Sequence, residues 1–366
     1  MPRVIGIDPG TVSIDLCGLD NGRVFLEWSL PTFETLAKPA VLLGLLDDAH
    51  RNAALDLVAG PSGYGLPLVH ARDLTGRDIR LAQLTAKGEI SGGIGGLGSL
   101  MRLLKRTSLP VVFTPGVIHL ASVPAHRKVN RVDMGTADKV CAVALAVHEQ
   151  AKRLGCSERE VSFIQLELGG AFTAAIAVEH GRIVDGAGGT SGALGLRGAG
   201  ALDGEVAFLA GSISKGLLFT GGVAAIAGPP EAPAAAIADP RSPRDRLARE
   251  AYLESIVKAV AALAVSAPAA RDVILSGRVA RIAGVLDELA RRLTGVVDGA
   301  SVHTLTGFAS MAKHAAQGAA LIADGLAGGK SASLVDALGI RDASGTVLDH
   351  LHVISQAAAR ARLGIK

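Results

Sequence analysis

The stretch VIGIDPGTVSIDLCGLDNGRVFLEW, residues 4–28, decides the fold. Its apolar runs are interrupted first by DPGTVS (8–13) and then by DNGR (20–23). Asn-Gly between apolar runs is a strong signal for a tight hairpin turn, so the stretch predicts three antiparallel strands. The first interruption combines glycine with hydroxyl side chains, which suits a loop that approaches phosphate closely.

The same order of features returns in the second half of the chain. FIQLELGGAFTAAIAV (163–178) contains a second glycine-hydroxyl segment, LGGAFT (168–173), and the turn EHGR (179–182) follows it. The turn glycines are Gly22 and Gly181, a separation of 159 residues. This order predicts an internal repeat of about half the chain, and hence two lobes of related topology.

The composition sets further limits. With 366 residues, the chain is about twice as long as a typical domain, which favours two domains. A net charge of +3 gives no basic stripe, so we expect no nucleic-acid partner. No apolar run of about 18 residues predicts a membrane span. Three cysteines without metal-ligand spacing, and a start that runs directly into a strand, indicate a cytoplasmic protein.

The division of the chain follows from the repeat. We predict an N-terminal lobe over residues 1–160 and a C-terminal, nucleotide-binding lobe over 161–349. A terminal helix over about 350–366 is expected to pack on the first lobe. Periodicity predicts helices over 136–155, 244–266 and 279–293, among others. The Pro- and Ala-rich stretch 228–244 is expected to be an exposed loop, and the glycine-rich stretch 88–99 a loop that leads into a helix.

The two loops supply most candidate phosphate contacts. These are Gly10, Thr11 and Ser13 in the first loop, and Gly169, Gly170 and Thr173 in the second. Neither loop is a Walker A motif, which carries Gly-Lys-Ser/Thr before a helix. Asp8, at the end of the first strand, could bind Mg²⁺ through water. Its alternative role is an Asx turn that satisfies loop N–H groups.

The order of these motifs resembles the superfamily of acetate and sugar kinases, heat-shock chaperones and actin. That resemblance implies an α/β chain with two ribonuclease-H-like lobes, the actin-like ATPase fold, with ATP and Mg²⁺ in an interlobe nucleotide cleft. VILSGR (273–278) resembles the adenosine motif, which implies adenosine contacts from Ser276, Gly277 and Arg278. Gly221 and Gly222 form a second Gly-Gly pair, and which pair meets the base is left open.

Within that group, the chain is most similar to butyrate and other short-chain acyl kinases, in the branch labelled predicted butyrate kinase. The similarity lies in residues 168–189, 200–208 and 302–322. It implies an ATP-dependent kinase of a small carboxylate, and a homodimer. Acyl kinases usually carry His just before the second-loop glycines, whereas this chain has Glu167. A carboxylate there would repel phosphate unless a metal or a cation intervenes, so Glu167 is a second candidate metal ligand.

The polar segment KVNRVDMGTADK (128–139) holds the remaining catalytic candidates. Arg131 and Lys139 could offset the charge of a transferred phosphoryl group. Asp133 and Asp138 could hold a metal or orient the acceptor, although Asp138 also suits a helix start. A carboxylate acceptor needs no general base, whereas a sugar-like alcohol would. A nucleotide switch or scaffold without acyl kinase activity is the other alternative.

Overall fold

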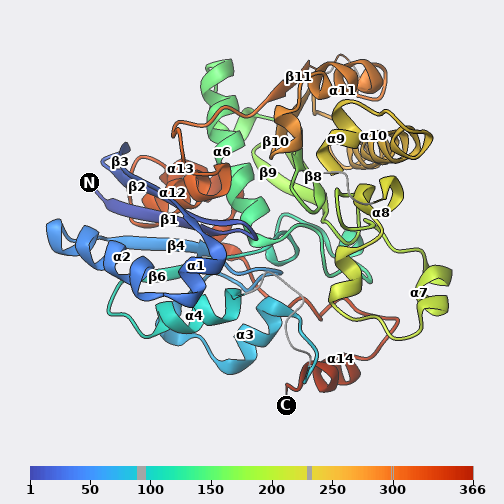
Figure 1. The fold of residues 1–366 in the computed structure, drawn as a ribbon. Coiled ribbons are helices and arrows are strands. Elements are labelled where there is room, and N and C mark those ends of the chain that lie inside the picture. The colour runs from blue at the N-terminus through green and yellow to red at the C-terminus, as the bar shows by residue number, and fades with distance from the viewer. Residues whose placement is uncertain (89–95, 229–232, 298, 300, 366) are drawn as a thin grey trace. The chain divides into compact units, whose positions relative to one another are not determined.

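The computed structural model describes residues 1–88, 96–228, 233–297, 299 and 301–365. They form two compact units, each built around one β-sheet (Figure 1). The first unit comprises Met1–Val132, Thr136–Glu158 and Thr306–Lys366. The second comprises Asp133–Gly135 and Arg159–Leu305.

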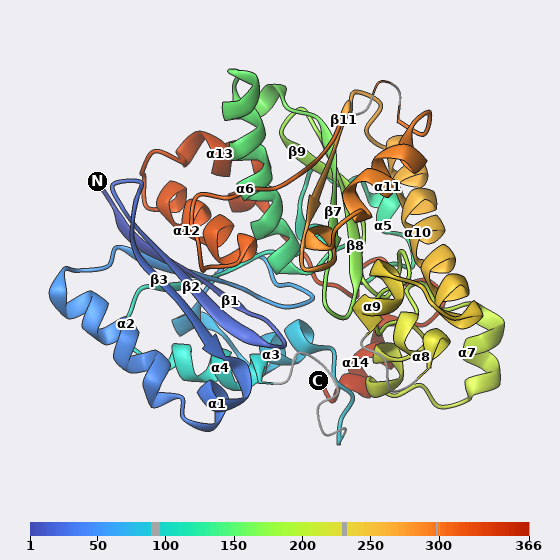
Figure 2. The same ribbon diagram turned by 45° about the horizontal axis from the view of Figure 1, so that its top comes forward.

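The sheet of the first unit has six strands in the order β3-β2-β1-β4-β6-β5. Their bounds are β1 (Arg3–Pro9), β2 (Ser13–Asp20), β3 (Arg23–Pro31), β4 (Leu57–Pro61), β5 (Val69–His70) and β6 (Val111–Thr114). The helices are α1 (Thr32–Ala37), α2 (Ala40–Asn52), α3 (Gly76–Gln83), α4 (Leu97–Lys105), α5 (Ala125–Lys128), α6 (Ala137–Leu154), α12 (His314–Leu326), α13 (Ala332–Leu338) and α14 (Gln356–Leu363). Figure 2 shows α6, α12 and α13 on one face of this sheet, and α2 and α4 on the other.

The sheet of the second unit has five strands in the order β11-β10-β7-β8-β9. Their bounds are β7 (Phe163–Leu168), β8 (Thr173–Glu179), β9 (Arg182–Ala187), β10 (Asp272–Ser276) and β11 (Ser301–Thr304). The helices are α7 (Gly204–Ala210), α8 (Val223–Ala227), α9 (Pro233–Ala238), α10 (Pro243–Ala264) and α11 (Val285–Leu293). One face of α10 is buried in the core of this unit, where Tyr252 and Ile256 are fully enclosed.

The structure confirms the internal repeat. β1, β2 and β3 form an antiparallel meander, and β7, β8 and β9 form another. The second turn of each meander has the same left-handed backbone: φ is 53° and 74° at Asn21 and Gly22, and 50° and 71° at His180 and Gly181. Two consecutive positive φ values are those of a type I′ turn, which is why both sequences place glycine there.

A strand irregularity repeats with the same spacing. The register shifts between Gly18 and Leu19 in β2, and between Ala177 and Val178 in β8. Residues 18 and 177 are 159 positions apart, which is also the separation of the turn glycines Gly22 and Gly181. A bulge conserved in place between two halves of one chain shows that the halves share their backbone plan as well as their turns.

Residues 306–349 lie in the first unit, whereas the sequence pattern predicted that they belong to the second lobe. The physical reason is the close packing of α12. A Cβ on Gly6 of β1 would lie 2.2 Å from the carbonyl oxygen of Ala316, and a Cβ on Gly318 would lie 1.7 Å from that of Cys141 in α6. Two glycines therefore let α12 lie directly against a strand and a helix of the first unit. α14 is in the same unit, where Arg80 donates to the carbonyl of Leu363 at 2.9 Å.

Two other segments differ from their predicted form. The helix expected over 279–293 is a 3₁₀ turn at Val279–Arg281 followed by α11. The Pro- and Ala-rich segment expected to be a loop contains α9. The glycine-rich segment 88–99 lies mostly outside the described residues, and its last residues begin α4.

Candidate functional site

The first loop, residues 10–13, joins β1 to β2 and closes on itself. The Gly10 amide donates to the carbonyl of Ser13 at 3.0 Å. From outside the loop, Thr32 occupies two carbonyls: its Oγ1 donates to Gly10 at 2.7 Å and its amide donates to Val12 at 3.0 Å. Among the described residues, the amides of Thr11 and Val12 have no acceptor. A loop whose carbonyls are occupied while successive amides stay open suits an anion.

A lysine from the far end of the chain lies over this loop. The ammonium of Lys313 is 2.9 Å from Oδ2 of Asp15 and donates to the carbonyl of Ser13 at 2.9 Å. A Cβ on Gly10 would lie 2.5 Å from that ammonium. Ser13 donates its hydroxyl proton to Asp15 at 2.7 Å, so this hydroxyl is turned away from the phosphate role predicted for it. Lys313 and Asp15 were not among the predicted site residues; in the sequence, Lys313 stands immediately before a small-residue helix.

Asp8 and Asp138 lie in one neighbourhood of the first unit, at the end of β1 and the start of α6. Burial raises the pKa of Cys141, and the negative charges of Asp138 and Asp8 both raise it further. Burial disfavours the charged form of Asp138, but the charge of Lys139 and its hydrogen bond outweigh this and lower the Asp138 pKa. Asp138 accepts from Lys139 at 2.6 Å and from the Thr136 hydroxyl at 2.5 Å. Asp138 and Lys139 are therefore paired at the start of α6, and Asp8 lies near the same Cys141 thiol as Asp138.

The second loop, residues 169–172, has the same closing bond as the first. The Gly169 amide donates to the carbonyl of Phe172 at 3.0 Å. Thr173, however, begins β8 and is fully buried, and its hydroxyl donates to that of Tyr252 at 3.5 Å. In the repeat Thr173 corresponds to Ile14, a core residue, and not to a loop hydroxyl. Its side chain therefore does not lie beside the second loop's glycines.

The end of β10 lies directly against the second loop. A Cβ on Gly277 would be 2.4 Å from the carbonyl oxygen of Leu168, and Cδ of Arg278 lies 3.7 Å from the place a Cβ on Gly170 would take. Ser276 is buried, and its hydroxyl accepts from Nε2 of Gln165 at 3.3 Å. The loop, Gly277 and Arg278 thus meet at one edge of the sheet in the second unit.

Gly221 and Gly222 reach the second loop only through an intermediate segment. Gly222 donates to the carbonyl of Arg197 at 2.8 Å, and the amide of Arg197 donates to the carbonyl of Ala171 at 2.9 Å. Gly221 pairs with Gly198 of the same segment. Of the two glycine motifs, the one at 276–278 is therefore the direct neighbour of the loop.

Asp133 and Arg131 lie in different units of the structure. Asp133 belongs to the second unit, where its Oδ2 accepts from the amide and hydroxyl of Thr190 at 2.9 and 2.8 Å. Its Oδ1 is buried and has no partner among the described residues. Arg131 is exposed at the surface of the first unit, and its amide donates to the carbonyl of Lys128 at 3.0 Å.

The two predicted metal ligands occupy equivalent places, one in each unit. Asp8 lies one residue before the end of β1, and Glu167 lies one residue before the end of β7. Asp8 is buried and Glu167 half-buried. In the part of the chain that the structure describes, no group of three or more His, Cys, Asp or Glu side chains could hold a metal ion. Mg²⁺ is commonly bound by one or two carboxylates together with phosphate oxygens, so a single carboxylate beside a loop fits it.

The fold is that of known kinases. The chain is similar to a propionate kinase from Francisella tularensis subsp. tularensis, with a TM-score of 0.61 and 13% identity, over 87% of this chain and 99% of that one. It is similar to an acetate kinase from Porphyromonas gingivalis, with a TM-score of 0.56 and 15% identity, over 87% of this chain and 98% of that one. It is also similar to an acetate kinase from Entamoeba histolytica, with a TM-score of 0.56 and 10% identity, over 80% of this chain and 85% of that one. These likenesses confirm the predicted fold class, the actin-like ATPase fold with two lobes.

The sequence itself defines the family. Residues 6–353 match the family described as protein of unknown function DUF1464, and the chain belongs to that family. A comparison with curated protein sequences finds no match. No helix among the described residues is long and apolar enough to cross a membrane.

Proposed function

We propose that the chain is an ATP-dependent phosphotransferase whose acceptor is a small molecule of the short-chain carboxylate class, such as acetate, propionate or butyrate. The observation that carries this proposal is the repeated loop with one closing bond, Gly10 to Ser13 and Gly169 to Phe172. Loops of this kind expose backbone N–H groups, which favours binding of the phosphate groups of a nucleotide. The likeness in fold to a propionate kinase and acetate kinases supports the choice of acceptor.

Each part of ATP has a proposed set of contacts. Backbone amides of each loop are proposed as contacts for phosphate oxygens, with the hydroxyl of exposed Thr11 as a further donor in the first loop. Adenosine binds beside Gly277 and Arg278, because these residues adjoin the second loop directly. Asp8 and Glu167 are proposed as carboxylates that could each bind, through water, the Mg²⁺ that accompanies a nucleotide.

The proposed reaction transfers the γ-phosphoryl group. A carboxylate oxygen of the acceptor forms a bond to the γ-phosphorus, and the bond from that phosphorus to the β,γ-bridging oxygen breaks. ADP leaves with the electron pair, and the other product is an acyl phosphate. The acceptor is already an anion, so no general base is required. Arg131 and Lys139 are proposed to offset the charge on the transferred group.

An acyl phosphate can be trapped, which makes the test direct. The purified protein is incubated with ATP, Mg²⁺ and each acid in turn, with hydroxylamine present to convert acyl phosphate into hydroxamate. The proposal expects hydroxamate and ADP in equal amounts for at least one short-chain acid. Slow ADP formation that no acceptor changes would select a nucleotide switch instead. The absence of ATP binding by calorimetry would end both proposals.

A sugar-like alcohol is the second acceptor class, because of one observation. Oδ1 of Asp133 is buried without a partner among the described residues, and an alcohol acceptor needs a base of this kind. The same assay with sugars and alcohols, read by ADP release without hydroxamate, tests this class. With an alcohol acceptor, Asp133→Asn would abolish turnover and leave ATP affinity unchanged.

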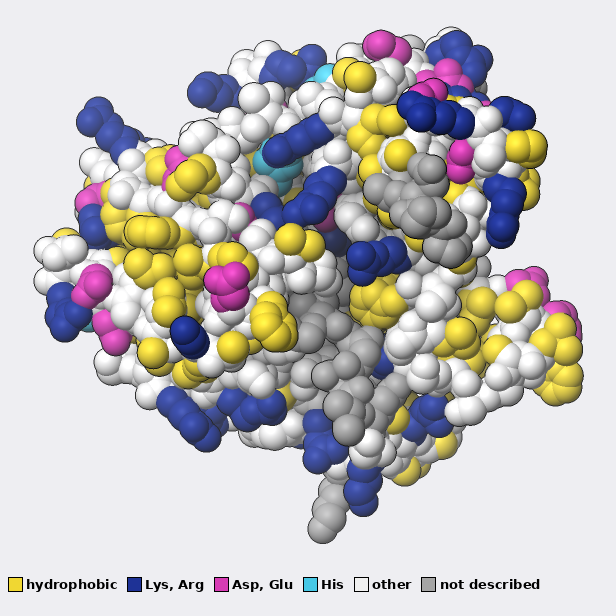
Figure 3. All heavy atoms as spheres, viewed as in Figure 1, with side chains coloured by type: hydrophobic (Ala, Val, Ile, Leu, Met, Phe, Trp, Pro, Cys, Tyr) yellow, Lys and Arg dark blue, Asp and Glu magenta, His cyan; other side chains and the backbone are white. Residues whose placement is uncertain are grey.

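We further propose a cytoplasmic homodimer. Hydrophobic side chains gather on α7 in Figure 3, and Val206, Phe208 and Leu209 of this helix are 51%, 79% and 80% exposed. Apolar side chains as exposed as these commonly mark a protein interface. Light scattering measures the oligomeric state, and Phe208→Ser should shift a dimer towards monomer. Cell fractionation measures the location.

A further inference from the structure

The sequence predicts that the Ser13 hydroxyl donates to phosphate from the first loop, but in the structure the cation beside this loop is Lys313. The hydroxyl of Ser13 donates inward to Asp15, so its proton is not directed at a ligand. The Lys313 ammonium lies beside Gly10, where a Cβ would be 2.5 Å from it. An ammonium has three N–H donors, and two of them point to Asp15 and to the Ser13 carbonyl. The third has no acceptor among the described residues and can serve a group that approaches the loop.

The surroundings of this ammonium favour an anion. The carbonyls of Gly10 and Val12 are occupied by Thr32, and the amides of Thr11 and Val12 have no acceptor among the described residues. The Lys313 side chain is 35% exposed, whereas its partner Asp15 is 1% exposed. The lysine therefore stands between a buried carboxylate and the open side of the loop. A cation beside a loop with two open amides can form a binding place for phosphate oxygens.

Three side chains fix the segment that carries Lys313. Glu149 accepts from the amides of residues 306 and 307 at 2.9 and 2.7 Å. Gln317 accepts from those of 308 and 309 at 2.8 and 3.1 Å. Glu27 accepts from those of 311 and 312 at 2.6 and 3.4 Å. Six of the seven amides before Lys313 are thus held by side chains of other elements, which places the lysine before any ligand binds.

We propose that Lys313 is a phosphate-binding residue of the first loop and that Asp15 is the residue that positions it. The inference rests on the proposed function, because it assigns a cation to the same phosphate-binding loop. The other explanation is that Lys313 only neutralises buried Asp15. The two explanations differ in their consequences for ligands: phosphate binding makes affinity depend on the phosphate chain, whereas neutralisation affects folding alone.

The test uses two variants of Lys313 and a matched control. Lys313→Met keeps the apolar stem and removes the charge, and Lys313→Arg keeps the charge. The control is Lys330→Met, because Lys330 also donates to a backbone carbonyl of the meander, that of Asn21 at 3.2 Å. That carbonyl lies at the other end of β2, roughly 20 Å from the first loop. Affinities for ATP, inorganic tripolyphosphate and adenosine are measured by calorimetry.

The expected result separates the three ligands. Lys313→Met weakens ATP and tripolyphosphate by about 10- to 100-fold, the range for a hydrogen bond to a charged group, and leaves adenosine unchanged. Lys313→Arg restores most of the affinity, and Lys330→Met has no effect. Asp15→Asn weakens ATP less than Lys313→Met does, again without a change for adenosine.

Folding is controlled by a double variant. If Lys313→Met alone does not fold, the pair Asp15→Asn with Lys313→Met removes the buried charge and its partner together. Wild-type affinity for ATP in the single or double Lys313 variant would overturn the inference while leaving the proposed function intact. If the wild-type protein binds tripolyphosphate but not ATP, the proposed function fails, and the Lys313 variants still decide the inference. Failure to bind either ligand overturns both.

Discussion

The carbonyl oxygen of Leu168 occupies the space that a side chain on residue 277 would need. A Cβ on Gly277 would lie 2.4 Å from that oxygen, and its φ is 90°, in the left-handed region. Only glycine satisfies both conditions without strain. Because Leu168 immediately precedes the second loop, this contact holds the end of β10 against it.

The first prediction tests that contact. Gly277→Ala should lower the free energy of unfolding by more than about 2 kcal/mol, since it adds backbone strain and a clash with a backbone atom. Gly284 is a matched control: its φ is 78°, but nothing lies within 4 Å of its Cβ position. Gly284→Ala should cost about 1 kcal/mol, from strain alone. Thermal and urea unfolding provide the comparison, and equal losses in the two variants would contradict the close approach.

The second prediction concerns the position of α12. Gly318→Ala should destabilise the first unit by about 2 kcal/mol or more, because its Cβ would lie 1.7 Å from the carbonyl oxygen of Cys141. Gly44→Ala in α2 has nothing within 4 Å and should raise stability by up to about 1 kcal/mol through helix propensity. The two alanines should therefore act with opposite signs in the same unfolding experiment. A stabilising Gly318→Ala would mean that α12 does not pack against α6.

These contacts show why the sequence predicted the repeat but not the whole loop. The turns at Gly22 and Gly181 are local, so a short pattern is enough to identify them. Lys313 is separated from Ser13 by 300 residues, and the two meet only because α12 packs against β1. No local pattern carries that information.

The hydroxyl of Thr173 was placed incorrectly beside the second loop for a different reason. The loop pattern in the sequence does not state where β8 begins, and successive residues of a strand point to opposite faces. A shift of one position therefore moves a side chain from the loop into the core. The structure shows that β8 begins at Thr173 itself, so its hydroxyl meets Tyr252.

The third prediction compares the two threonines. Thr11→Val should weaken ATP by about 3- to 10-fold, because an exposed loop hydroxyl is lost as a donor to phosphate. Thr173→Val should leave ATP affinity unchanged and cost about 1 kcal/mol of stability, because the buried Tyr252 hydroxyl loses its partner. Calorimetry and thermal unfolding of both variants give the two readouts. The reverse pattern, with ATP affinity lost only in Thr173→Val, would contradict this prediction and show that Thr173 contributes to phosphate binding.

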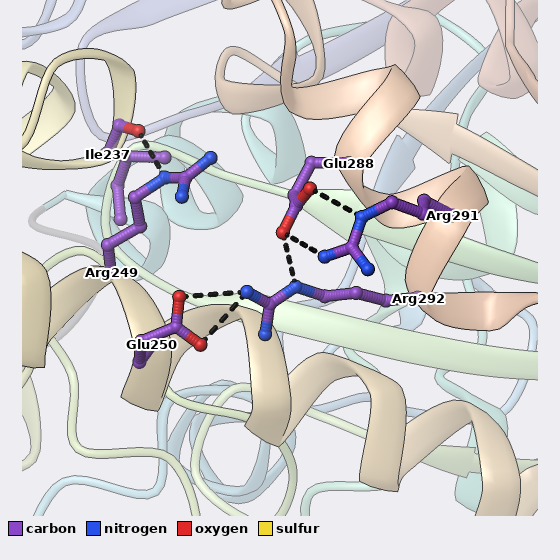
Figure 4. Close-up of polar contacts among 6 residues, drawn as sticks. All are labelled: Ile237, Arg249, Glu250, Glu288, Arg291 and Arg292. Carbon is purple, nitrogen blue, oxygen red and sulfur yellow. Dashed lines mark hydrogen bonds and ion pairs between the residues drawn. The ribbon is translucent and has the colours of Figure 1, made fainter.

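The last prediction concerns an ion-pair network on the second unit, where Glu288 of α11 lies between two arginines (Figure 4). Glu288 accepts from Nε and Nη2 of Arg291 at 3.0 and 2.8 Å, and from Nε of Arg292 at 2.7 Å. Arg292 also donates to both carboxylate oxygens of Glu250 in α10, at 2.8 and 2.9 Å. Hydrogen bonds from Arg291, and then those from Arg292, lower the pKa of Glu288 to about 2. The network thus ties α11 to α10.

The sign of the pH dependence follows from that lowered pKa. A carboxyl whose pKa is lower in the folded state stabilises the fold above its unfolded value of 4.5, and loses the contribution as pH falls towards 2. Glu288→Gln should therefore cost about 1 kcal/mol at pH 7, the scale of partly exposed ion pairs, and almost nothing at pH 2. Glu254→Gln is the control, because the ion pair that Glu254 forms among the described residues is with Lys258 on its own helix, and it should change stability little at either pH. Unfolding measured from pH 7 to pH 2 tests this, and a Glu288→Gln deficit that persists at pH 2 would show that shape, and not charge, holds the two helices together.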